Sequence, residues 1–276
     1  MAIRIRGKEY KFEYDPDDKF VVPGLAVAFC EELAEDFMPI FYDTWGHGTN
    51  PLPPEFLAYR LIVDEEGKRI CAIYELYWKR QECTWRELNK DHEHDYEQVQ
   101  IHFSIEEGEI ERVVVSSAGP VESGGHGIEI YSRIKKARVR SVEYTTSPKP
   151  AFPWGGDEGK KNSTQVREMP MEKLTFGGSR PAVEILNCYH AFAGLKRELS
   201  SDEKNMLSPP MERLDRKLLE KWYYLHSTNK FGHDLSKPFD EPHLMYYPPP
   251  GDPLSRLAYG FLWLVFKIGA QTLARW

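Results

Sequence analysis

The chain has 276 residues, of which 41% are hydrophobic and 29% are charged, and its formal net charge is −7. This is the composition of an ordinary globular protein rather than a disordered chain, and the length allows a sizeable core. Phosphate binding requires a concentrated positive surface, so nucleic acid is not expected as a partner. The densest basic stretch, residues 133–140, has the spacing of a charged strand as well as that of a patch.

The four cysteines are Cys30, Cys71, Cys83 and Cys188, which are too scattered for a disulfide framework. They are expected to be free thiols in a reducing compartment, with a Cys71–Cys83 bridge as the alternative. The N-terminus has no apolar signal core, which predicts a cytoplasmic protein.

The first two thirds of the chain are dominated by β-strand patterns. A hairpin is predicted over residues 3–14, a helix over 23–43 and a loop over 45–54. A second Pro/Gly-rich loop is predicted over residues 149–164. Alternating or β-branched runs predict strands over residues 55–64, 68–78, 96–105, 109–118, 127–134, 138–146 and 180–192, the last being the final clear strand.

After residue 200 the pattern becomes helical and proline-rich. Residues 209–227 place Met211, Leu214, Leu218, Leu219 and Trp222 at helical spacing. Residues 257–274 are strongly apolar, with Lys267 as their one charge. A helix docked on the core is favoured there, and peripheral membrane association through residues 254–276 is the alternative.

These patterns predict a mainly β (α+β) fold. A central antiparallel β-sandwich carries peripheral helices and a helical C-terminal extension. The expected domains are a core over residues 1–200, which holds the candidate site, and an extension over residues 201–276 that packs on it.

The stretch DHEHDYEQVQIHF, residues 91–103, combines a strand pattern with three histidines and four carboxylates. Successive side chains of a strand point to opposite faces. One face therefore carries Asp95 and Glu97, followed by Val99, Ile101 and Phe103. The other face carries Tyr96, Gln98, Gln100 and His102.

The apolar end of the first row predicts that this row faces the core. Inward carboxylates are costly unless a positive group meets them. That group is either a basic side chain, such as Arg112 or Lys79, or a metal ion. His92 precedes the strand and completes a set of three metal ligands with Asp95 and Glu97. Such an oxygen-rich set favours Mg²⁺ or Ca²⁺ and also admits Mn²⁺ or Zn²⁺.

At these residues the chain resembles a known family. DHEHDYE, residues 91–97, is similar to the heptapeptide Gly-His-Arg-His-Asp-Trp-Glu of the necrosis- and ethylene-inducing-protein-like superfamily, and it is identical at four of seven positions. SGGHGIEIY and RPAVEILNCYHAF resemble further elements of this superfamily and its vacuolar-protein-sorting-like relatives. The resemblance spans about residues 50–195.

The resemblance implies a β-sandwich with an acidic cavity that holds a divalent cation. It assigns the cation to His92, Asp95 and Glu97 and places His190 near the cavity, with His94 and His126 lining it. Glu82 is the nearest match to a further family carboxylate, although the spacing differs. Asp91 and Glu93 replace the family's Gly and Arg, and no signal peptide is visible, so the family's cytolytic activity is not carried over.

Three functions remain open from the sequence. The first is a binding module whose cation ligates a sugar or a lipid headgroup. The second is a metal-dependent hydrolase with His94 or His190 as general base. The third is a membrane-associated protein with a structural metal site. No nucleotide-binding or serine-nucleophile motif occurs, so whether the chain is an enzyme is undecided.

Overall fold

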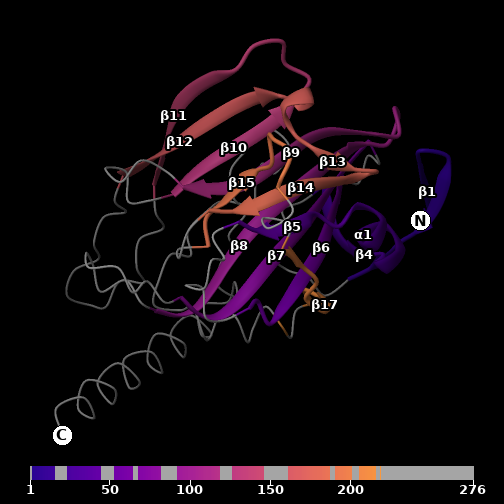
Figure 1. The fold of residues 1–276 in the computed structure, drawn as a ribbon. Coiled ribbons are helices and arrows are strands. Elements are labelled where there is room, and N and C mark those ends of the chain that lie inside the picture. Colours follow the sequence, from indigo (N-terminus) through magenta and orange to yellow (C-terminus); the bar gives the residue numbers. More distant parts are fainter. Residues whose placement is uncertain are drawn as a thin grey trace, which may run out of the picture.

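Most of the folded chain belongs to one curved sheet of 15 strands, beside which lies a separate two-stranded hairpin (Figure 1). The computed structural model describes residues 2–15, 24–44, 53–64, 68–81, 92–118, 126–145, 161–186, 190–200, 205–215 and 218. Within these ranges, the side chains of residues 80, 81, 92–94, 96, 118, 126, 142–145 and 161–164 are not described. The mainly β class that the sequence predicts is confirmed.

The N-terminal hairpin is formed by β1 (Ala2–Ile5) and β2 (Lys8–Lys11), and it ends before residue 14, the limit that the sequence predicted. Arg6 and Gly7 make its two-residue turn, both with positive φ, which is the geometry that lets a tight hairpin follow the twist of its strands. The apolar side chains of the two strands alternate toward the core.

The single helix predicted over residues 23–43 is wrong. The segment forms β4 (Leu25–Phe29), α1 (Glu31–Phe37) and β5 (Ile40–Asp43). Both strands form by pairing with strands that are distant in the sequence, since β4 pairs with β6 and β5 pairs with β14. Such long-range pairing overrides local helical periodicity.

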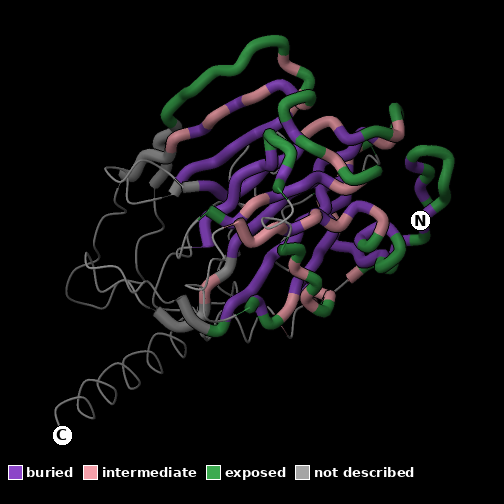
Figure 2. Tube along the Cα trace, in the orientation of Figure 1, coloured by how far each residue is buried: buried purple, intermediate pink, exposed green. Residues whose placement is uncertain are grey.

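The centre of the sheet is an antiparallel array of β6 (Phe56–Asp64), β7 (Arg69–Gln81), β8 (His92–Ser104) and β9 (Glu109–Ala118). The prediction for β9 matches at both ends. The predicted bounds omit residues 79–81 of β7 and 92–95 of β8, which are the ends at which these two strands pair with each other. Figure 2 shows that these central strands are buried along most of their length.

The sheet is mixed rather than purely antiparallel as predicted, because four of its described pairings are parallel. One joins β10 (His126–Ser132) to β12 (Lys161–Pro170), and β11 (Arg138–Thr145) then pairs along the outer side of β12. The start of β12 lies in the predicted loop 149–164. A short 3-10 helix, η2 (Met171–Lys173), and β13 (Phe176–Gly177) follow β12.

A second layer packs over the central array. It is formed by β5, β14 (Arg180–Ile185) and β15 (Phe192–Gly194), and β15 joins the two layers through its pairing with β9 (Figure 1). The strand predicted over residues 180–192 is therefore two strands, of which β14 ends at Ile185 and β15 begins at Phe192. Short strands complete the sheet at its edges: β3 (Glu13–Tyr14), β16 (Met206–Leu207) and β17 (Met211–Arg213).

Residues 205–215 belong to the core sheet, although the sequence assigns them to a separate extension. Met206 pairs across to β5, and Met211 to Arg213 form a strand beside β6 rather than the start of the predicted helix 209–227. Leu214 is fully buried against β6 and β7. Apart from Leu218, which packs against the same cluster, the rest of the predicted extension lies outside the described residues.

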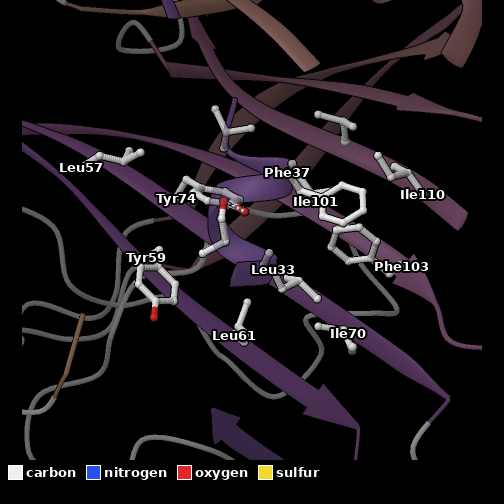
Figure 3. Packing of buried hydrophobic residues seen from close by; sticks show 14 of the residues in the cluster. Leu33, Phe37, Leu57, Tyr59, Leu61, Ile70, Tyr74, Ile101, Phe103 and Ile110 are labelled. Atoms are coloured by element: carbon white, nitrogen blue, oxygen red, sulfur yellow. Dashed lines mark hydrogen bonds between the residues drawn. The ribbon is translucent and has the colours of Figure 1, made fainter. Parts of the chain in front are cut away.

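The main core lies between the two layers and includes the inner face of α1. Leu33 and Phe37 of α1 lie among side chains of β6, β7 and β8, and the Phe37 and Phe103 rings meet edge to face at 4.8 Å (Figure 3). Burying each such aromatic side chain contributes roughly 2–3 kcal/mol. This packing fixes the inward face of β8 on which the candidate site lies.

Two further sequence predictions concern cysteines and membranes. Cys30 and Cys71 are buried free thiols, as predicted, and Cys83 and Cys188 lie outside the described residues. Across the part of the chain that the structure describes, no helix has the length and apolar character needed to span a membrane. The apolar segment 254–276 lies outside that part.

Candidate functional site

The inward row predicted for β8 is confirmed at every position whose side chain is described. Val99, Ile101 and Phe103 are fully buried in the main core. Glu97 extends this row toward the start of the strand and is only 8% exposed. Asp95 comes next and is partly buried. The strand therefore directs carboxylates toward the core side, as the alternation of its sequence requires.

The opposite face of β8 is also buried, which the sequence does not predict. Gln98, Gln100 and His102 are each at most 3% exposed. Gln98 Nε2 donates to Glu75 Oε1 at 2.6 Å, Gln100 Nε2 donates to Gln98 Oε1 at 2.6 Å, and His102 Nε2 lies 3.2 Å from Gln100 Oε1. Each amide of this row thus has a partner, and such pairing makes polar burial tolerable.

His102 closes that polar row as a neutral imidazole. Burial, reinforced by the positive charges of Arg112 and Arg69, lowers the pKa of His102 to about 3. Arg112 lies directly across from His102 on β9, on the outward side of β8. It therefore does not meet the inward carboxylates, although one interpretation of the sequence proposed Arg112 as their partner. Lys79, the other proposed partner, is exposed.

The partner of Asp95 is His190. The His190 imidazole donates from Nδ1 to Asp95 Oδ2 at 2.7 Å. The His190 side chain is 1% exposed and that of Asp95 is 13% exposed, so the contact is shielded from water. Hydrogen bonds to a carboxylate are stronger than those between neutral groups, and burial strengthens them further. The structure thus brings together two residues that the sequence assigned to one site.

Backbone and ring contacts hold His190 in a fixed orientation. Its φ of 52° lies in the left-handed region, which costs a non-glycine residue about 1–2 kcal/mol. The ring stacks in parallel on Trp78, with centroids 4.1 Å apart and planes 2° apart. Trp78 is the cross-strand neighbour of Asp95. Trp78, Asp95 and His190 therefore form a three-residue cluster in which each side chain restrains the next.

The cluster lies where β8 and β9 separate. Among the described residues, their ladder extends to the pair Val99 and Val115. Immediately beyond it, the Gln98 N–H donates to the Ser116 hydroxyl at 2.9 Å. Ser117 then pairs with Phe192 of β15 instead of with β8. The segment that carries His190 thus enters where the two strands part, opposite Asp95.

The other predicted site residues are less defined. His92 does not precede the strand as predicted but is the first paired residue of β8, and its position, three residues before Asp95, falls on the opposite strand face. His126 begins β10, and the side chains of His92, His94 and His126 are not described. Glu82 lies outside the described residues. Among the described side chains, no group of three or more His, Cys, Asp or Glu residues is close enough to hold a metal.

Trp78 is fully buried and stacks on His190. Its place directly across from Asp95 depends on the β7–β8 register, and a local sequence pattern does not specify this register.

Comparison of the chain with protein-family models, with curated proteins and with solved structures finds no match.

Proposed function

We propose that the chain binds a divalent cation at the start of β8, with Asp95 and Glu97 as ligands. The observation that carries this proposal is the buried hydrogen bond from His190 to Asp95 Oδ2, in a row that continues with the buried Glu97. Carboxylates that bind metals are commonly oriented by a hydrogen bond to one oxygen. In this arrangement His190 orients Asp95 and does not itself bind the cation.

The donor types support a hard cation. Asp95 and Glu97 supply oxygen atoms, so Mg²⁺ or Ca²⁺ is favoured over Zn²⁺ or Mn²⁺. The two carboxylates lie two residues apart on one strand face, which separates their backbones by about 6.6 Å. Their side chains can converge on one ion from that spacing. The resemblance of residues 91–97 to the necrosis-inducing superfamily supports the same two carboxylates.

We further propose that the bound cation holds an oxygen-rich ligand, such as a sugar or a lipid headgroup. Hard cations keep coordination positions for water, which vicinal hydroxyls or phosphate oxygens can replace. A hydrolase is the alternative, with a cation-activated water as nucleophile. The complete burial of His190 weighs against this residue as the general base, because a base must reach the reacting water.

Calorimetric titration of EDTA-stripped protein with Ca²⁺, Mg²⁺, Mn²⁺ and Zn²⁺ tests the cation site. The variants Asp95→Asn and Glu97→Gln are each expected to weaken binding by at least tenfold, because each replaces a charged carboxylate ligand with a neutral amide. His92→Ala is expected to bind like the wild type, since position 92 falls on the opposite face of β8. Glu106→Gln, which changes an exposed carboxylate in the turn after β8, is the control and should bind like the wild type. Equal affinity in all five proteins would exclude this site.

The use of the cation is tested separately. Glycan-array binding and flotation with anionic vesicles are expected to disappear in EDTA and in Asp95→Asn. Turnover of ester or phosphoester substrates by the wild type but not by Glu97→Gln would instead support the hydrolase. Flotation that persists in EDTA and is lost without residues 254–276 would support the third function, membrane association with a structural metal site.

A further inference from the structure

We propose that Glu129 is a positioning residue for the candidate site, acting through β15 on the contact between His190 and Asp95. The inference rests on the proposed function only in its consequence for cation binding. Glu129 lies on β10, which is three strands away from β7 in the sheet and is separated from β8 by β9. Its buried carboxylate holds the segment that carries His190.

Glu129 is a fully buried carboxylate whose oxygens both accept hydrogen bonds. It is 1% exposed on β10. Oε2 accepts from the Tyr131 hydroxyl at 2.6 Å and from the backbone N–H of Gly194 at 3.1 Å, and Oε1 accepts from Lys196 Nζ at 2.9 Å. Arg167 lies 3.7 Å from Oε1. Two of these donors, Gly194 and Lys196, belong to the chain that follows His190.

The backbone of β15 packs closely against the side chains of Glu129 and Tyr131. A side-chain carbon added at Gly194 would overlap the Tyr131 phenol ring, so a larger residue there would move β15 away from β10. Burial and the neighbouring Glu129 charge raise the pKa of Tyr131, which keeps its hydroxyl protonated as a donor. Glu129 and Tyr131 together therefore fix the position of β15 on the sheet.

The short segment from His190 to Lys196 is thus held at both ends by carboxylates. Asp95 binds the side chain of His190 at one end, and Glu129 binds Gly194 and Lys196 at the other. Between these points β15 has one ladder pair with β9 and three with β14. Glu129 therefore anchors one end of the segment whose other end presents the left-handed His190 to Asp95, in addition to these ladder pairs and the stacking of His190 on Trp78.

Hydrogen exchange measured by mass spectrometry on the full chain tests this coupling without any metal. In Glu129→Gln and in Tyr131→Phe, amides of residues 192–196 should exchange at least tenfold faster than in the wild type. Amides of residues 95–98, which lie on another strand, should also exchange faster. A purely local structural role would change β10, β12 and β15 alone.

The matched control is Glu168→Gln. Glu168 is also a buried, ion-paired carboxylate, but it lies on β12 and is bound by Arg138 and Arg140 on the other side of that sheet region. This control should leave exchange at residues 95–98 unchanged. If Glu129→Gln and Glu168→Gln affect residues 95–98 equally, or neither affects them, the inference is overturned.

Calorimetry of the same variants separates this inference from the proposed function. If the wild type binds a cation, Glu129→Gln should weaken binding about tenfold, as removal of a residue that orients a ligand commonly does, and Glu168→Gln should not. If the wild type binds none but exchange at residues 95–98 responds to Glu129→Gln, the proposed function fails and the positioning role stands. Cation binding that is unaffected by Glu129→Gln, with unchanged exchange, would remove the positioning role alone.

Discussion

The contact between Asp95 and His190 can be tested by how two substitutions of Asp95 differ. Asp95→Ala removes the acceptor and leaves a buried imidazole N–H without its partner, since the His190 side chain is 1% exposed. Leaving a buried donor unsatisfied costs about 1–3 kcal/mol. Asp95→Asn keeps an oxygen at the same place and loses only the charge, so it should cost about 1 kcal/mol. We therefore expect Asp95→Ala to be the more destabilising of the two.

The assay is urea unfolding at pH 7 in EDTA, so that cation binding does not contribute to the free energy of unfolding. A double-mutant cycle combines Asp95→Ala with His190→Ala, and alanine shares the left-handed strain of histidine at position 190. The coupling free energy should be about 1–2 kcal/mol, because the pair is in direct contact. Glu106→Ala is the control, and as an exposed substitution it should stay within about 0.5 kcal/mol of the wild type.

Two results would refute this reasoning. A coupling free energy below about 0.3 kcal/mol would mean that the two residues stabilise the fold independently. An Asp95→Asn variant as unstable as Asp95→Ala would mean that the charge, and not the hydrogen-bond acceptor, is what the site requires. The second result would point to a fully charged partner for Asp95.

Further predictions concern the support of the site and the core. Gly194→Ala should destabilise the protein by several kcal/mol, because its methyl group overlaps Tyr131, and Tyr131→Ala should partly relieve this cost in a double mutant, as measured by urea unfolding. Phe103→Ala should cost about 3–5 kcal/mol by the same assay, since the ring is fully buried against Phe37, and a loss below about 1 kcal/mol would contradict the packing. His102 stays neutral in the fold while the unfolded chain binds a proton near pH 6.5, so stability should fall as the pH drops from about 6.5 toward 3. The slope due to His102 is at most about 1.4 kcal/mol per pH unit, and His102→Gln should lack this part of it in unfolding measured between pH 7 and pH 4.

The sequence predicts best those strands whose neighbouring strands show the same alternating or β-branched pattern. The hairpin over residues 3–14 and the strands β6 and β9 show alternation or β-branched runs bounded by turns, and the fold places them as expected. The segment 23–43 shows the limit of local patterns. Its apolar residues fit a helix as well as strands, and the choice is made by pairing with β6 and β14, which lie far away in the chain.

The candidate site divides in the same way. Alternation alone predicts that Glu97 and Asp95 share the inward face with Val99. It cannot predict that His190, 95 positions after Asp95, provides the partner, because this contact depends on β15 entering where β8 and β9 part. The family resemblance placed His190 near the site without this geometry. No sequence signal indicated the role of Glu129, since an isolated Glu in an alternating strand looks like an ordinary outward residue.

The separation of β8 from β9 connects the architecture with the proposed chemistry. In a continuous sheet, ladder bonds would pair the start of β8 with β9, and its inward carboxylates would lie under a closed core. Here β15 takes over the edge of β9 at Ser117, and the junction between the two layers lies beside Asp95. A ligand site needs side chains that are held rigidly but are not sealed between packed strands. At the junction His190, stacked on Trp78, holds Asp95 by a hydrogen bond, and the Asp95 side chain keeps an exposure of 13%. The left-handed strain at His190 is kept at this junction by its contacts with Asp95 and Trp78, and because strained backbone often clusters at functional sites, it supports the proposed cation site.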